Sequence, residues 1–250
     1  MPIRFLALSQ TLKKTYAAQM SKAPQIDPRP VGDFVEPLPP GILPDFRPLH
    51  GRWSRLDPLS AERHGPSLYR YSAGHDDIWT YLFSGPFADQ PSFTAWLKAR
   101  QTEKDLWFYA YVKRDTGEAL GMGSFMRAEP AHGVIEIGNI WMSPVLQRTR
   151  EGTEAIYLMM RHAFDDLGMR RLEWKCNALN APSRRAAERY GFAFEGVFRQ
   201  HLIVKGHNRD TAWYSIIDKD WPRIKQGFEA WLADSNFDVD GQEKAKLRVA

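Results

Sequence analysis

The chain has 250 residues, of which 43% are hydrophobic and 26% charged, a composition typical of a globular domain and not of a disordered or fibrous protein. Its net charge of +4 is small against 34 basic and 30 acidic side chains, so nucleic acid is permitted as a partner but not indicated. No run approaches the roughly 20 apolar residues that span a bilayer, and the single cysteine, Cys176, excludes an internal disulfide framework.

Residues 1–49 are predicted to form a tail and a proline-rich arm. Residues 1–26 contain basic but no acidic side chains, which is typical of a mitochondrial transit peptide, and a short helix or a frayed tail is the alternative. The lone cysteine favours a reducing compartment, so a cytoplasmic location is expected, with the mitochondrion left open. Residues 24–48 are rich in proline, which predicts an extended arm that lies over the next domain or leads into it.

Residues 50–233 are predicted to form the main domain, which begins with strands and short helices. Ser60 is a good N-cap for a helix, and residues 115–117 form a turn between two antiparallel strands. The elements predicted in this first half are a strand at 51–56, a helix from Ser60 to about residue 70, short helices at 76–83 and 91–101, and strands at 106–113, 119–126 and 134–142.

The second half continues with strands and longer helices. The helix 150–167 has one apolar stripe and ends at Gly168. The strand 171–176 alternates, with Leu172, Trp174 and Cys176 facing one way. The remaining predicted elements are a helix at 180–190, strands at 194–205 and 211–218 around residues 206–210, a helix at 221–232, and a mobile charged tail at 234–250.

The segment 147–155 runs from the end of a strand directly into an amphipathic helix and carries Gly152 in the first turn. A helix start presents unpaired N–H groups and the positive end of the helix dipole, and both favour a bound anion. The segment therefore predicts a phosphate-binding turn.

Four segments together resemble the GNAT superfamily of acyl-CoA N-acyltransferases, in particular its ribosomal-protein N-terminal alanine and serine acetyltransferases. They are the loop 147–152 (QRTREG), the strand end 140–142 (IWM), the helix start 180–183 (NAPS) and the stretch 190–192 (YGF) with the residues that follow it. The resemblance implies an α/β (α+β) fold with a mixed, mainly antiparallel twisted sheet flanked by helices. It also implies acetyl-CoA as co-substrate.

The resemblance assigns the acetyl-CoA site residue by residue. One departure is Arg150, which stands where the family has the first loop glycine; either the loop relaxes and Arg150 adds a contact to the pyrophosphate, or the affinity for CoA is reduced. The implied cofactor-binding residues are Ile140, Trp141, Met142, Gln147, Arg148, Thr149, Arg150, Glu151, Gly152, Thr153 and Asn180.

Two residues are catalytic candidates by the same resemblance. Glu136 is the expected general base, and strand alternation places it on one face with Gly138 and Ile140. Ser183 is the expected proton donor to the departing thiolate. The alternatives are that Glu136 only pairs with a neighbouring arginine or caps the strand edge, and that Asn180 and Ser183 only cap a helix.

We therefore expect a monomeric or homodimeric N-acetyltransferase that acts on a primary amine, a small molecule or a protein N-terminus, by direct attack in a ternary complex. No metal is expected, because the histidines show no ligand spacing. A CoA-binding regulatory module without turnover and an RNA- or ribosome-binding protein are the alternatives.

Overall fold

The computed structural model describes residues 30–249. Contacts divide the chain into Met1–Leu38 and a compact unit from Pro39 to Ala250, and the description that follows concerns the second unit. The predicted targeting segment, 1–26, lies outside the described residues. Within the described part of the chain, no helix is both long enough and apolar enough to cross a membrane.

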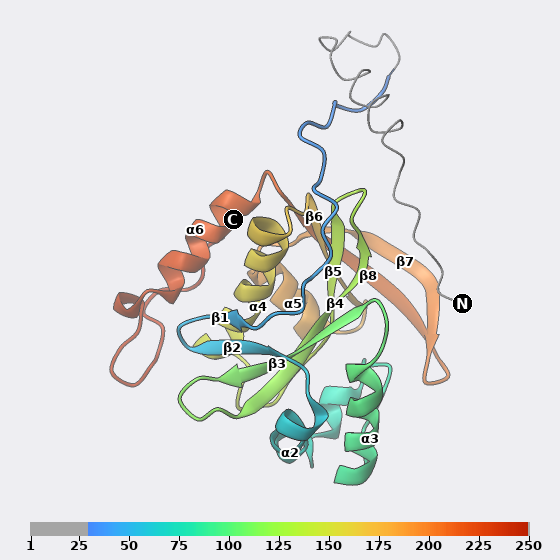
Figure 1. Ribbon diagram of the computed structural model, residues 1–250, viewed down its shortest axis with the longest axis vertical. Helices are drawn as coiled ribbons and strands as arrows, with labels where there is room; N and C mark the ends of the chain where they lie inside the picture. The colour runs from blue at the N-terminus through green and yellow to red at the C-terminus, as the bar shows by residue number, and fades with distance from the viewer. Residues whose placement is uncertain (1–29, 250) are drawn as a thin grey trace, which may run out of the picture. The chain divides into compact units, whose positions relative to one another are not determined.

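Eight strands form one sheet in the order β1-β2-β3-β4-β5-β6-β8-β7. All neighbours pair antiparallel except β5 and β6, which are parallel. The predicted fold class, a mixed and mainly antiparallel sheet flanked by helices, is confirmed (Figure 1). The strands are β1 (Leu49–His50), β2 (Ser54–Pro58), β3 (Leu106–Lys113), β4 (Ala119–Glu129), β5 (Val134–Met142), β6 (Arg171–Asn177), β7 (Ala193–Val204) and β8 (His207–Ile217).

The helices begin at capping residues that the sequence supplies. The side chains of Ser60, Asp89, Thr149 and Asn180 each accept a hydrogen bond from a backbone N–H of the first turn. The helices are α2 (Ala61–Ser72), the 3₁₀ turn η1 (Asp76–Trp79), α3 (Gln90–Gln101), α4 (Arg150–Arg161), the π-helical turn η2 (His162–Asp166), α5 (Ala181–Arg189), α6 (Trp221–Leu232) and the 3₁₀ turn η3 (Asp234–Asn236).

Helices cover both faces of the sheet, and strand β3 supplies each core with alternate residues. Tyr109 and Tyr111 belong to the cluster under α4 and α6, whereas Phe108 and Ala110 belong to the cluster under α2 and α3. Figure 1 shows α4 and α6 on one side, with α2 and α3 grouped apart from them.

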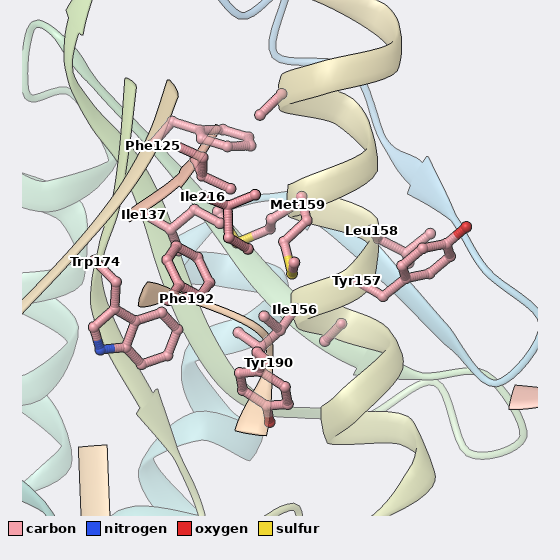
Figure 2. Close-up of a cluster of buried hydrophobic side chains, with 14 of the residues drawn as sticks. Phe125, Ile137, Ile156, Tyr157, Leu158, Met159, Trp174, Tyr190, Phe192 and Ile216 are labelled. Carbon is pink, nitrogen blue, oxygen red and sulfur yellow. The ribbon is translucent and has the colours of Figure 1, made fainter. Parts of the chain in front are cut away.

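Helix α4 anchors the larger of these two clusters. In Figure 2, Ile156 and Met159 point from α4 toward Ile137 and Phe192. Tyr157 points the other way, and its ring stacks on that of Phe228 of α6 at a centroid distance of 5.2 Å. Helix α4 is therefore held between the sheet and α6, which fixes the position of its N-terminus.

Several predicted segments differ from the structure. The strand expected at 51–56 is Ser54–Pro58, and the helix expected at 76–83 is a 3₁₀ turn at Asp76–Trp79. The strand β8 begins at His207 instead of residue 211, because Lys205 (φ 50°) and Gly206 (φ 80°) alone make the turn. Two consecutive positive φ values match the twist of a tight hairpin. The tail after Asp234 was expected to be mobile, yet Phe237 and Val249 are buried, and Val249 joins the core beside Gly191 and α6.

Candidate active site

Strands β5 and β6 separate at the centre of the sheet. Their parallel pairing covers Val134 to Glu136 on β5 and ends opposite Glu173 of β6. Beyond this point β5 stays paired with β4 and β6 stays paired with β8. The two strands therefore leave a gap with backbone groups along each side, at their carboxyl ends.

A β-bulge at Asn139 accompanies this separation. Gly138 pairs with Ser124 of β4 but Trp141 pairs with Met122, so β5 has one extra residue, and Asn139 has φ 52°. The bulge corrects one prediction. Ile140 packs against the same cluster as Ile137, so its side chain does not share the face of Glu136, because the extra residue shifts the alternation by one.

A cleft with an empty volume of about 790 Å³, part of it open to solvent, lies at the gap. It brings together four residues predicted for the site, Glu136 and Ile140 from β5 and Asn180 and Ser183 from the start of α5. Trp141, Met142 and residues 147–153 are not among its lining residues. The predicted catalytic candidates line this cleft, whereas the predicted phosphate turn follows the end of β5 and lies outside its lining.

Glu136 is 3% exposed and lies between two cations. Its Oε2 accepts a hydrogen bond from Arg127 Nη1 at 2.7 Å and is 2.9 Å from Lys175 Nζ. Its Oε1 faces Gly138, where an added Cβ would lie 3.3 Å from it and only 2.4 Å from Met126 Sδ. The pairing with an arginine, named above as the alternative to a base role, is present, and the second carboxylate oxygen is the one left for a substrate or water.

Arg127 and Lys175 were not predicted as part of the site. Arg127 reaches Glu136 because a second bulge, with φ 47° at Arg127, interrupts the pairing of β4 with β5. Lys175 is 2.6 Å from Glu173 Oε2 as well as close to Glu136. The alternation of β6 could have placed Glu173 and Lys175 on one face, but only the strand order places that face beside Glu136.

Ser183 and Asn180 both make hydrogen bonds within the protein. Asn180 Oδ1 accepts a hydrogen bond from Ser183 N at 3.1 Å, which is the helix cap named as the alternative. Ser183 Oγ accepts one from Trp174 Nε1 at 3.0 Å. Since the indole can only donate, the hydroxyl donates elsewhere, and it faces the thiol of Cys176, whose pKa is raised by burial.

The turn before α4 has the features of an anion site. Thr149 Oγ1 accepts the hydrogen bond from Gly152 N at 3.0 Å, whereas the N–H groups of Arg150 and Glu151 bond to nothing among residues 30–249. Gly152 permits a close approach, because a Cβ there would lie 2.5 Å from the carbonyl oxygen of Leu146.

Arg150 causes no backbone strain at the position where the family has glycine. It is the first residue of α4, and the positive φ of the turn, 62°, falls on Arg148. The Arg150 guanidinium lies over the ring of Trp53, 3.4 Å from its centroid, and also faces Phe237 at 4.6 Å. Its side chain therefore packs on aromatic rings.

Comparison with known proteins places the chain among acetyltransferases. Residues 55–193 match the model of the acetyltransferase (GNAT) domain. A GCN5-related N-acetyltransferase from Brucella melitensis superposes with a TM-score of 0.80 and 46% identity, covering 84% of this chain and 95% of that one.

Two bacterial relatives are similar over shorter stretches. YdaF of Bacillus subtilis, named provisionally as a ribosomal N-acetyltransferase, is 30% identical over 42% of this chain and 57% of its own length. The ribosomal-protein-serine acetyltransferase of Escherichia coli is 31% identical over 40% of this chain and 56% of its own. The chain thus spans less than two thirds of either relative. The domain and its relatives indicate an N-acetyltransferase, and the chain belongs to the GNAT acetyltransferase family.

Proposed function

We propose that the protein transfers the acetyl group of acetyl-CoA to a primary amine by direct attack in a ternary complex. One observation carries this proposal: the gap between β5 and β6 opens into a cleft lined by a buried carboxylate, Glu136, and by the hydroxyl of Ser183 in the first turn of α5. The relatives named as ribosomal-protein acetyltransferases favour a protein N-terminus as acceptor, and a small-molecule amine is the other option.

The residues present fit acetyl-CoA in three ways. The free N–H groups of Arg150 and Glu151 at the start of α4 suit a pyrophosphate. Gly152 lets the turn fold tightly against Leu146. The unpaired edges of β5 and β6 offer backbone groups to a chain lying between them, and Asn180 stands at the same opening. Bound there, acetyl-CoA supplies the activated acyl group.

Glu136 would act on the acceptor amine. The free Oε1 accepts a proton from the ammonium, directly or through one water, while Arg127 and Lys175 hold the carboxylate in place through Oε2. The Ile140 N–H would donate to the carbonyl oxygen of the thioester. As the carbon–nitrogen bond forms and the carbon–sulfur bond breaks, the Ser183 hydroxyl donates to the departing sulfur.

The need for a base depends on the acceptor. An alkylammonium with a pKa of about 10.4 costs roughly 4.6 kcal/mol to deprotonate at pH 7, whereas a protein α-amine with a pKa of about 7.7 to 8.0 costs only about 1.0 to 1.4 kcal/mol. A carboxylate in the cleft therefore matters most for lysine-like amines.

A thiol-release screen tests the proposal. The protein is incubated with acetyl-CoA and a panel of amines, comprising peptides with free N-termini, polyamines and amino acids, and release of CoA is followed with a thiol reagent. We expect release with one class and a loss of about tenfold or more in Ser183→Ala. If calorimetry shows CoA binding but no amine gives release, the protein is a non-catalytic CoA-binding module.

A further inference from the structure

Arg209 of β8 is a buried cation that has no carboxylate partner in the described part of the chain. It is 7% exposed, and its Nε donates to Thr211 Oγ1 at 3.2 Å. Its guanidinium lies over the ring of Phe83 at 5.1 Å. No acidic oxygen lies within 4.0 Å of it among residues 30–249. A buried charge is normally paired, so this one stands out.

Arg209 faces the cleft that holds Glu136. Arg127, Lys175 and Arg209 all line this cleft, but the first two are paired with Glu136. Burial lowers the pKa of Arg209, and Cys176 and Glu136 oppose this effect only in part. The cleft therefore carries an excess of positive charge that its own acidic residue does not balance.

Arg209 lies on the face of the sheet opposite α4. On β8, Ala212, Tyr214 and Ile216 belong to the core cluster that α4 covers. Arg209 and Trp213 lie at the alternate positions of β8, so their side chains point to the opposite face of the sheet. On that face, Lys175 Nζ lies 3.8 Å from the centroid of the Trp213 ring. The turn before α4, where the pyrophosphate is expected, is therefore on the other side of the sheet. An anion at Arg209 is then part of the acceptor.

The segment from Trp79 to Phe83, at the end of η1 and after it, closes this part of the cleft. Tyr81 donates its hydroxyl hydrogen bond to the carbonyl of Leu179 at 3.2 Å, and Lys205 Nζ donates to the carbonyl of Trp79 at 2.8 Å. These contacts join the segment to the loop between β6 and α5 and to the turn between β7 and β8, so Phe83 is held over Arg209. Partial exclusion of water strengthens an ionic contact to the guanidinium.

We propose that Arg209 binds a carboxylate that the acceptor carries near its reactive amine, so that the enzyme selects acidic amines. The inference rests on the proposed acetyl transfer. A guanidinium pairs with a carboxylate through two parallel hydrogen bonds, which fixes orientation as well as charge. Two sources present this chemistry: a free amino acid, through its α-carboxylate, and a peptide N-terminus, through an acidic side chain close to it.

Matched pairs of acceptors test the inference. Amino acids are compared with their amides, and peptides carrying Asp at the second position with the same peptides carrying Asn. Because a nearby carboxylate raises the pKa of an amine, kcat/KM is corrected to the neutral amine fraction. We expect the acidic member of one pair type to be preferred about 10-fold or more, and the pair type identifies the source.

Variants then locate the preference at Arg209. Arg209→Gln should abolish the preference for the acidic acceptor. It should lower kcat/KM about 10- to 100-fold for the acidic member of a pair and less than about threefold for the neutral member, and the KM for acetyl-CoA should not change. Arg209→Lys should keep part of the preference, because charge remains but the paired geometry is lost. Arg199→Gln alters an exposed arginine of β7 outside the cleft and is the matched control. It should leave kcat/KM unchanged for both the acidic and the neutral acceptor.

Binding without turnover separates this inference from the proposed activity. With CoA in place of acetyl-CoA, calorimetry should show the acidic acceptor binding to the wild type and to Arg199→Gln but much more weakly to Arg209→Gln. This result would support the inference even if no thiol were released. An equal loss for both members of each pair, or no preference in the wild type, would overturn it while leaving the acetyl transfer intact.

Discussion

Replacing Glu136 by Gln removes a negative charge and keeps the shape of the side chain. The carboxylate oxygen Oε2 lies 2.7 Å from Arg127 Nη1 and 2.9 Å from Lys175 Nζ. An amide oxygen can still accept both hydrogen bonds, and Lys175 keeps Glu173 at 2.6 Å. The fold should therefore survive the substitution, and the main loss should be the capacity to accept a proton.

The expected loss follows from the acceptor's pKa. General-base catalysis typically raises a rate about 10²- to 10⁴-fold. At pH 7, deprotonating an alkylammonium costs about 3 kcal/mol more than deprotonating a protein α-amine. We expect Glu136→Gln to lower kcat on an alkylamine by about 100-fold or more. On a peptide N-terminus the loss should be about tenfold or less, and it should shrink for both as the pH rises and the amine deprotonates.

Glu173→Gln is the matched control for this experiment. It removes the other carboxylate that contacts Lys175, yet Glu173 does not line the cleft. Thiol release is measured at saturating acetyl-CoA from pH 6.5 to 9.5, with thermal unfolding of each variant alongside. Equal losses in Glu136→Gln and Glu173→Gln would show that the ion pairs with Lys175 matter and that Glu136 is no base. An unchanged rate in Glu136→Gln would refute the role outright.

Three further predictions concern CoA binding and stability. Gly152→Ala should weaken calorimetric CoA binding about tenfold, because the new Cβ would sit 2.5 Å from the Leu146 carbonyl oxygen and displace the turn; unchanged affinity would argue against this turn as the site. Ile156→Ala should lower the free energy of unfolding by about 2 to 5 kcal/mol in denaturant titration, since Ile156 is fully buried. A smaller loss would mean that the surrounding side chains relax to fill the cavity. Hydrogen bonds from Arg171 lower the pKa of Glu195 to about 2 from its usual 4.5, so stability present above pH 4.5 should fall between pH 4.5 and 2. Glu195→Gln should flatten the pH dependence in that range, and an unchanged slope would contradict the assignment.

Much of the fold could be predicted because periodicity is strong in the central elements. The strands Leu106–Lys113 and Val134–Met142 and the helix Trp221–Leu232 have the predicted bounds, since alternation and helical spacing of apolar residues are local properties. The turn at Lys205 could not be predicted in the same way. A lysine with positive φ is tolerated there because the pairing of β7 with β8 stabilises it.

The candidate site was partly predictable for a similar reason. Glu136, Asn180 and Ser183 were named from the family resemblance, and the phosphate turn from a glycine at a helix start. The partners of Glu136 were not, because Arg127 comes from a bulged neighbouring strand and Lys175 from the parallel strand beyond the gap. Bulges depend on the register between strands, which no single strand's residues reveal.

The amino-acid sequence alone determined the order and nature of the elements, the helix caps and the segments that resemble a GNAT enzyme, because propensity, capping and hydrophobic period act over a few residues. The tertiary structure decided where β5 and β6 part, which face Ile140 takes after the Asn139 bulge, and that Arg209 faces the cleft with no acidic partner among residues 30–249. These features arise from packing and register between segments far apart in the chain. The interactions that stabilise them form only when those segments come together in the folded protein.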